Sequence, residues 1–212
     1  MRRLQRSDNA FVGTSGMDSS QLAPFDFGRV VEAVQRVDEC RDHAVELMES
    51  AHIPYAVIGG HAVAAWIDSV DSSAARFTRN VDLLIHRGDV GRACDAISVF
   101  GYPATIRKRQ VLFRKSDKPW HAATIRLLVG GEQVQPTDIQ PLPTPEQSVV
   151  LNGFRCLALR PLVEMKLNDW RTIDKVHIQD LAGVDLVNAD WYEFLPKLWT
   201  QRLESLLENP NG

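Results

Sequence analysis

The spacing of apolar residues predicts a long amphipathic helix followed by a short buried strand. From Phe27 to His52, apolar residues recur every three or four positions and charged residues fill most other positions, which is typical of one helical face against a core. Pro54 ends this helix, because the residue before a proline leaves the helical region. The run Tyr55–Ile58 is apolar throughout and predicts a buried strand. A second helix is expected from His61 to about Val70.

Strands and helices alternate along the middle of the chain, and helices dominate its end. Val81–Ile85 predicts a strand whose alternation places Asn80, Asp82 and Leu84 on one face. A proline-rich passage at 136–145 is expected to be an extended linker, because proline is excluded from central strands. The other expected helices are 89–100, 161–170, 173–186 and 191–208, the last broken at Pro196. The other expected strands are 102–106, 110–114 and 122–129, and 154–159 is expected to be a short strand or a loop.

This order of elements predicts an α/β (α+β) fold, in which a mixed sheet is flanked by helices and followed by a helical C-terminal part. Four segments are expected along the chain. They are a flexible polar lead-in at 1–24, an α/β core at 25–135, a proline-rich linker at 136–153 and a mainly helical part at 154–212.

Composition and charge are those of an ordinary soluble globular protein. Of the 212 residues, 44% are hydrophobic and 24% charged, and the net charge of −3 favours neither nucleic acid nor an anionic membrane. No apolar stretch approaches the ~18 residues of a membrane span, so no membrane contact is expected. Cys40, Cys94 and Cys156 have no metal-ligand spacing, and a reducing cytoplasm is expected. Cys40 and Cys94 lie on apolar helical stripes, where buried thiols are the expected interpretation.

Two polar features at strand ends are candidates for chemistry. Gly59 and Gly60 end the first strand and open a helix, and such a turn exposes backbone N–H groups that bind phosphate. A plain strand-to-helix turn has the same pattern. About twenty residues later, Asn80 and Asp82 are two positions apart on a strand and therefore point to one face. Two carboxylates in that arrangement hold Mg²⁺ against a triphosphate.

These two features together resemble the DNA polymerase beta-like nucleotidyltransferase superfamily. The resemblance is carried by IGGHAVAAW at 58–66 and RFTRNVDLLI at 76–85, with Asn80 where the family has Asp. The run from Leu162 to Leu181 resembles the helical motif of the AbiEii/AbiGii toxin-type branch, a lysine-leucine helix followed by an arginine and two aspartates. The resemblance implies a nucleotidyltransferase-like fold whose C-terminal helices complete a nucleotide cleft.

The resemblance also implies roles for individual residues. Asp82, aided by Asn80, is expected to bind metal and to act in catalysis, and Lys166 is expected to reach a phosphate as a mobile point charge. An exposed lysine is the alternative for Lys166, and a solvated helix face is the alternative for the two aspartates of the helical motif. The residues expected at the nucleotide are Gly59, Gly60, His61, Thr78, Arg171, Asp174 and Asp180.

The expected set of metal-binding carboxylates is incomplete. The family usually places a third carboxylate, often the general base, on a later strand. The expected strand at 122–129 has Arg126 and no acid, which leaves Glu132 as a displaced substitute. Because Asn80 is neutral, the Asn80/Asp82 pair carries one negative charge where a hard dication prefers several. One metal ion that arrives already bound to the triphosphate is the remaining arrangement.

Two functions follow as hypotheses. The first is a cytoplasmic protein that binds a nucleoside triphosphate with Mg²⁺ or Mn²⁺ and, if active, transfers a nucleotidyl group to RNA, a protein or a small molecule. Such a protein would be a toxin-like or defence component with an antitoxin-like partner. The second is a catalytically degenerate relative that acts as a nucleotide sensor or a protein-interaction module. A basic patch at 107–118 is either a contact for an RNA backbone or a solvated hairpin face.

Overall fold

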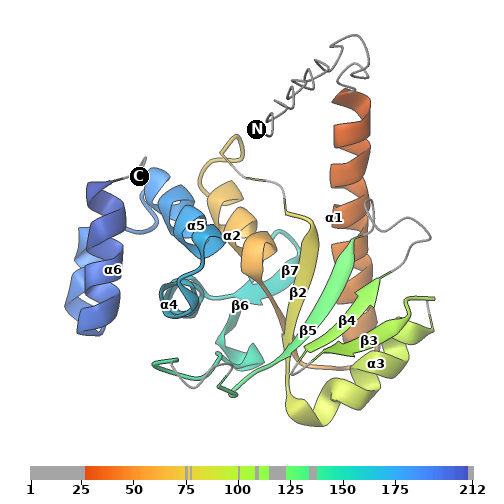
Figure 1. Ribbon diagram of the computed structural model, residues 1–212. Helices are drawn as coiled ribbons and strands as arrows, with labels where there is room; N and C mark the ends of the chain where they lie inside the picture. The colour runs from red at the N-terminus through yellow and green to blue at the C-terminus, as the bar shows by residue number, and fades with distance from the viewer. Residues whose placement is uncertain are drawn as a thin grey trace, which may run out of the picture.

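The structure is a computed structural model that describes residues 27–74, 76, 78–99, 101–107, 110–114, 123–133 and 138–209. The predicted lead-in at 1–24 and half of the basic patch at 107–118 lie outside these residues. Figure 1 shows a sheet with the long helix α1 on one side and the group α2, α4, α5 and α6 on the other. The predicted α/β architecture is confirmed.

Seven strands form one mixed sheet in the order β3-β4-β5-β2-β1-β7-β6. The central strand β2 pairs antiparallel with β1 and parallel with β5. All residues of β1, and all of β2 after Asn80, are buried. The strands are β1 (Tyr55–Ile58), β2 (Asn80–Ile85), β3 (Ala104–Arg107), β4 (Gln110–Arg114), β5 (Thr124–Val129), β6 (Ser148–Leu151) and β7 (Phe154–Leu157).

The helices form where the apolar spacing predicts them. The predicted break at Pro196 separates a short 3-10 helix from the last helix. The α-helices are α1 (Phe27–Ser50), α2 (Gly59–Asp68), α3 (Val90–Ser98), α4 (Leu159–Asp169), α5 (Thr172–Gly183) and α6 (Lys197–Glu208). The 3-10 helices are η2 (Arg87–Asp89), η3 (Pro145–Gln147) and η4 (Ala189–Phe194).

A hairpin at 148–157 extends the sheet: its second strand, β7, lies within the short strand or loop expected at 154–159, whereas its first strand, β6, lies in the expected proline-rich linker. Strands β6 and β7 pair antiparallel, and β7 also pairs parallel with β1. Asn152 and Gly153 form the two-residue loop, and both have a positive φ, at 51° and 84°. Asn-Gly is the preferred sequence for such a loop, because both positions require a left-handed backbone. The sheet therefore receives strands from both sides of the expected domain boundary.

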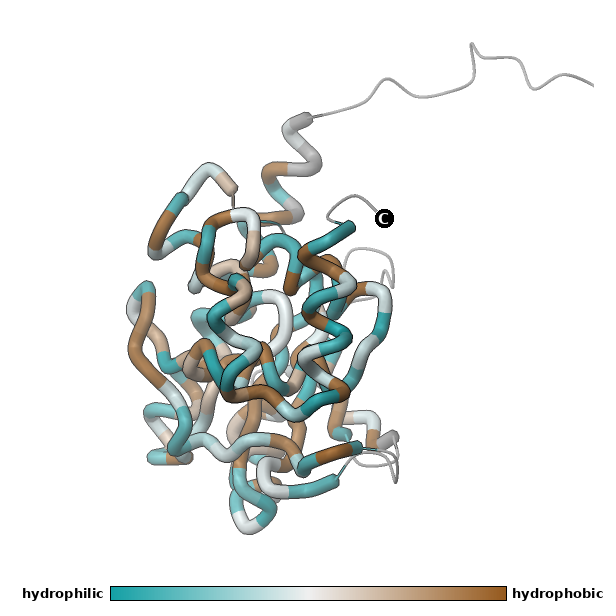
Figure 2. Tube along the Cα trace, turned by 90° about the vertical axis from the view of Figure 1, so that its left-hand side faces the viewer, coloured by the Kyte–Doolittle hydropathy of each residue, from teal (hydrophilic) through white to brown (hydrophobic). Residues whose placement is uncertain are grey.

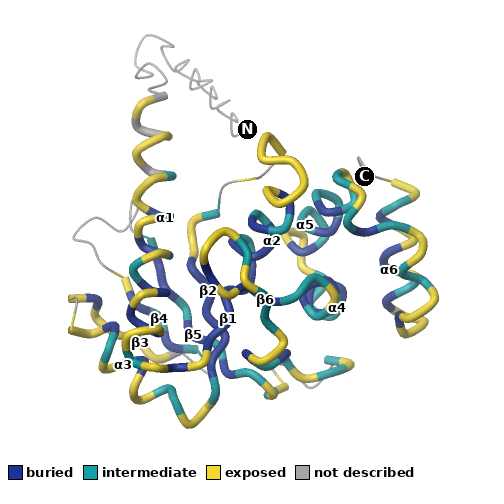
Figure 3. The backbone as a smooth tube through the Cα atoms, turned by 180° about the vertical axis from the view of Figure 1, so that it is seen from behind, coloured by how far each residue is buried: buried dark blue, intermediate teal, exposed yellow. Residues whose placement is uncertain are grey.

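The core fills the space between the sheet and the helices on its two sides. Figure 3 shows buried residues along the strands and on the inward faces of the helices, while the first turns of α1 are exposed. Figure 2 shows polar and apolar segments alternating along the helical turns, as amphipathic packing requires. Among the helices within the described ranges, none combines the length and the apolar character needed to cross a membrane.

Candidate functional site

Most of the predicted site residues meet at a cleft where β1 ends and α2 begins. The cleft has a volume of about 370 Å³ and lies between the β2–β5 part of the sheet and helices α4 and α5. The predicted residues that line it are Gly59, Gly60, Thr78, Asn80, Asp82, Lys166 and Arg171. The structure therefore brings seven of the ten predicted residues to one cleft, although the arrangement inside it differs from the expected one.

The two glycines are required by close contacts within the protein itself. Gly59 has a φ of +71°, and a Cβ atom there would overlap the carboxylate of Asp82. A Cβ atom on Gly60 would lie 2.6 Å from Oγ1 of Thr78. Helix α2 begins at this turn without a side-chain cap on its first turn. Its first backbone N–H groups therefore lack intrahelical acceptors at the mouth of the cleft.

Asp82 is held by an arginine on the neighbouring strand. The parallel pairing of β2 and β5 places Asp82 directly opposite Arg126. Nε and Nη2 of Arg126 donate to the two carboxylate oxygens of Asp82, which gives a bidentate ion pair. The side chain of Asp82 is only 9% exposed, and that of Arg126 is 29% exposed. The carboxylate of Asp82 is therefore neutralised by a cation of the same chain.

This arrangement does not fit a divalent metal ion. Both oxygens of Asp82 are engaged by Arg126, and its neighbour Asn80 is neutral. At an effective dielectric of 20, a dication about 4 Å from the guanidinium would be repelled by roughly 8 kcal/mol, as much as one carboxylate at the same distance would attract it. Over the described part of the chain, no group of three or more His, Cys, Asp or Glu side chains could hold a metal ion. The expected metal site at Asp82 and Asn80 is therefore not supported by the residues present.

Glu132 does not replace the missing carboxylate. It pairs with Arg87, beyond the turn that follows β5. It lies six positions after Arg126, beyond the end of β5 at Val129 and the turn at Gly130-Gly131. Arg126 thus occupies the strand position at which a third carboxylate was sought.

Lys166 is a buried ion-pair partner instead of a mobile charge. Its side chain is 3% exposed, and its Nζ lies 2.8 Å from Oδ1 of Asp174, which is fully buried. Nε of Arg171 donates to the other oxygen of Asp174 at 2.7 Å. Burial raises the pKa of Asp174, but the hydrogen bonds from Arg171 and Lys166 outweigh burial and hold this pKa below its usual value. Asp174 therefore joins α4 to the start of α5 from beneath the cleft.

Arg171 is the more accessible cation of this group. Its side chain is 56% exposed, and its Nη2 donates to Asp169 at 2.9 Å. The hydrogen bond to Asp174 raises the pKa of Arg171 above its usual value. In and directly beneath the cleft, three cations (Arg126, Lys166 and Arg171) face three carboxylates (Asp82, Asp169 and Asp174), so their formal charges sum to zero.

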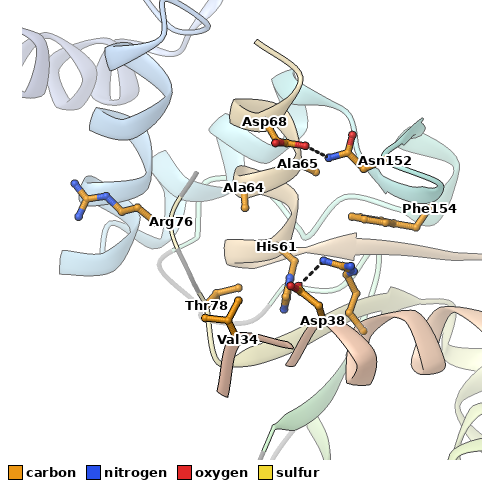
Figure 4. A pocket seen from close by; sticks show the side chains of 11 residues that line it. Val34, Asp38, His61, Ala64, Ala65, Asp68, Arg76, Thr78, Asn152 and Phe154 are labelled. Atoms are coloured by element: carbon orange, nitrogen blue, oxygen red, sulfur yellow. Dashed lines mark hydrogen bonds and ion pairs between the residues drawn. The ribbon is translucent and has the colours of Figure 1, made fainter. Parts of the chain in front are cut away.

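Two predicted residues lie away from the cleft. His61 follows Gly60 in α2, and because successive helical residues are about 100° apart, its side chain leaves the helix in another direction than the cleft. It points toward α1 and lines a second cavity of about 490 Å³ (Figure 4). Burial lowers the pKa of His61 to about 4. Within the structure as described, its Nε2 has no hydrogen-bond partner. Asp180 pairs with Arg76 at 2.9 Å and does not line the cleft.

Sequence reasoning missed an apolar wall that completes the cleft. Met165 and Ile173 come from the C-terminal helices, and Leu142 comes from the proline-rich passage. Ile58 and Leu128 complete this wall. Each of these residues has the pattern of an ordinary core position, and only the tertiary arrangement brings them to one surface. The neighbouring His177 also lines the cleft, and burial lowers its pKa to about 4.

Comparison with solved structures identifies the architecture as a nucleotidyltransferase fold. The structure matches ANT(2″)-Ia in complex with adenylyl-2″-tobramycin with a TM-score of 0.55 and 14% identity, over 82% of this chain and 99% of that chain. It also matches a Helicobacter pylori protein described as a nucleotidyltransferase, with a TM-score of 0.52 and 15% identity, over 84% of this chain and 80% of that chain.

At these identities the likeness concerns the fold alone, and the predicted nucleotidyltransferase-like fold is confirmed. No protein-family model matches the sequence, and no curated protein matches it. The predicted closeness to the AbiEii/AbiGii branch stays a prediction.

Proposed function

We propose that this chain is a nucleotide-binding protein that uses the cleft to sense a nucleoside triphosphate and does not transfer its nucleotidyl group. The observation that carries the proposal is the cleft itself. It combines an uncapped helix N-terminus, partly exposed arginines and an apolar wall at the Gly59–Gly60 turn of a nucleotidyltransferase fold.

Phosphate groups are the ligand chemistry that suits the polar side of the cleft. The first N–H groups of α2 have no intrahelical acceptor and no side-chain cap, and the positive end of the helix dipole favours an anion there. Arg171 is 56% exposed and presents a planar fork of N–H donors, which matches phosphate oxygens. The N–H groups of Arg126 that Asp82 does not use add further donors on the sheet side.

The apolar wall suits the base of the nucleotide. Met165 has a flexible, polarisable side chain that packs against aromatic rings. Together with Leu142 and Ile173 it gives the cleft an apolar surface opposite its charged groups. A ligand with a flat aromatic part and an anionic part satisfies both surfaces, and a nucleoside triphosphate has this composition.

Transfer is not proposed, because the cleft does not present the carboxylates that the reaction requires. Two-metal transfer requires several carboxylates around the ions, whereas Asn80 is neutral and Asp82 is paired. A sensor needs binding alone, and the paired charges give it a preformed site. The hypothesis of a toxin-like transferase with an RNA or protein acceptor and an antitoxin-like partner is therefore the alternative that an activity assay must test.

Calorimetric titration with ATP, GTP, CTP and UTP tests the binding. We expect at least one to bind, and we expect Arg171→Ala to weaken that binding by roughly ten- to a hundredfold, since a hydrogen bond to a charged group contributes about 1.5–3 kcal/mol. Arg36→Ala is the matched control, because Arg36 is also an exposed, ion-paired arginine, at 55% exposure on α1. If no nucleotide binds, or if the two variants bind equally well, the proposal is wrong.

A transfer assay separates sensing from catalysis. Each labelled nucleoside triphosphate is incubated with the protein, Mg²⁺ or Mn²⁺, and RNA, protein and small-molecule acceptors. We expect no transfer of label to any acceptor or to the protein itself. Transfer that is abolished by Asp82→Ala would show instead that the chain is an active nucleotidyltransferase.

A further inference from the structure

We propose that the guanidinium of Arg126 takes the place of the divalent cation in this cleft, so that ligand binding is independent of metal. Only the nucleotide part of this inference rests on the proposed function. The part that concerns metal binding rests on Asp82, Asn80 and Arg126 alone.

The position of Arg126 is the first observation. Parallel pairing sets Asp82 opposite Arg126, so that both side chains lie on the face of the sheet that lines the cleft. The bidentate contact engages both oxygens of Asp82. A metal ion at this position would have to displace a guanidinium that cannot be neutralised by losing a proton.

The remaining donors of Arg126 are the second observation. A guanidinium has five N–H donors, and the bidentate pair with Asp82 uses two of them. The other three belong to a side chain that is 29% exposed and lines the cleft. One face of the guanidinium is thus bound to a carboxylate, and its free edge can donate to anionic oxygens. Arg126 would thus lie between a carboxylate and a phosphate, as a divalent ion does in a metal-dependent site.

The neutral Asn80, where the family pattern has Asp, is the third observation. It matches the single positive charge of a guanidinium, which is lower than that of a divalent ion. A guanidinium carries one positive charge, and Asp82 alone balances it. A second carboxylate at position 80, on the same face of β2, would leave an excess negative charge in the cleft. The two departures from the nucleotidyltransferase pattern, Asn80 and Arg126, therefore compensate each other.

Titration with Mn²⁺ alone tests the metal part of the inference. The wild-type protein is expected to bind no Mn²⁺, while the double variant Asn80→Asp/Arg126→Asp is expected to bind it and to melt at a higher temperature in its presence. The control Asn80→Asp/Arg155→Asp has the same net charge and alters an exposed arginine of β7 outside the cleft. Binding of Mn²⁺ by the wild type, or equal binding by the two double variants, overturns the inference.

Nucleotide binding by the wild-type protein gives a second test that needs no variant. The dissociation constant for whichever of ATP, GTP, CTP and UTP binds is measured in Mg²⁺ and again in EDTA, and the two values are expected to agree within about threefold. Weakening of more than about tenfold in EDTA would show that the site depends on metal. If no nucleotide binds in either buffer, the proposed function fails, and the Mn²⁺ titration still decides the role of Arg126.

Discussion

The buried pair of Lys166 and Asp174 allows a sharp test of how the C-terminal helices are held. Asp174→Ala removes the carboxylate that accepts from Lys166 at 2.8 Å and from Arg171 at 2.7 Å. Lys166 is 3% exposed, so its ammonium group would be left without its partner in a site that water barely reaches. Breaking a buried ion pair in this way costs about 3–5 kcal/mol. That is a large part of the ~5–15 kcal/mol by which a typical domain is stable.

Urea denaturation at neutral pH measures this cost. The control is Asp169→Ala, which removes another carboxylate that pairs with Arg171. The side chain of Asp169 is 23% exposed, so its loss is expected to lower the free energy of unfolding by about 1 kcal/mol or less. The double variant Lys166→Met/Asp174→Leu removes both charges and is expected to recover most of the lost stability, because two apolar side chains leave no buried charge unpaired.

Two results would refute this reasoning about Lys166. If Asp174→Ala costs less than about 1 kcal/mol, the ammonium group reaches water, and Lys166 behaves as the mobile charge that the sequence suggested. If the double variant is as unstable as Asp174→Ala, the loss arises from packing and not from the unpaired charge. In either case the pair would not be the structural link between α4 and α5.

Further predictions concern the turn and the second cavity. Gly59→Ala is expected to lower the free energy of unfolding by about 2 kcal/mol or more, because Gly59 has a positive φ and a Cβ atom there would overlap Asp82. The control Gly91→Ala meets no atom within 4 Å and is expected to cause no loss. Urea denaturation measures both variants, and equal effects would contradict the close approach of Gly59 to Asp82. The pKa of His61 is lowered from 6.5 to about 4, so protons favour the unfolded chain, and stability present above pH 6.5 is lost as the pH falls toward 4. The His61 contribution to the free energy of unfolding should fall by about 2 kcal/mol between pH 8 and pH 5. Urea denaturation at pH 8 and pH 5 measures this fall. We expect it to be absent in His61→Gln and present in His52→Gln, and a stability loss in His61→Gln as large as in the wild type would disprove the assignment to His61.

The elements that sequence reasoning predicted well are those with local signals. The spacing of apolar residues located α1, and Gly59–Gly60 located the start of α2. Strand β6 was missed, and with it the β6–β7 pairing, although the hairpin signal, Asn152-Gly153, is also local. The nearby prolines led to the interpretation of that region as a linker, but proline restricts only its own position and the residue before it.

The charge state of the cleft could not be predicted from local patterns. The partner of Asp82 lies 44 residues away on a strand that is adjacent only in the folded sheet. Arg126 marked a missing acid in the sequence, but its contact with Asp82 depends on the parallel register of β2 and β5. Lys166 has the sequence environment of an exposed lysine, and its burial depends on how α4 and α5 pack together. These facts depend on tertiary contacts, which no spacing rule contains.

The paired charges also explain why a single substitution would not recreate a metal site. Arg126→Asp alone would place two carboxylates side by side, with Asp82 nearly buried and without a cation, and like charges at that distance destabilise the fold. Asn80→Asp alone would add a carboxylate beside an Asp82 that is still occupied by Arg126. Arg126→Asp alone leaves β2 without a second carboxylate to bind the metal, and Asn80→Asp alone leaves Arg126 in the position of the metal. Positions 80 and 126 therefore act as one unit, and a change in the type of cation requires both.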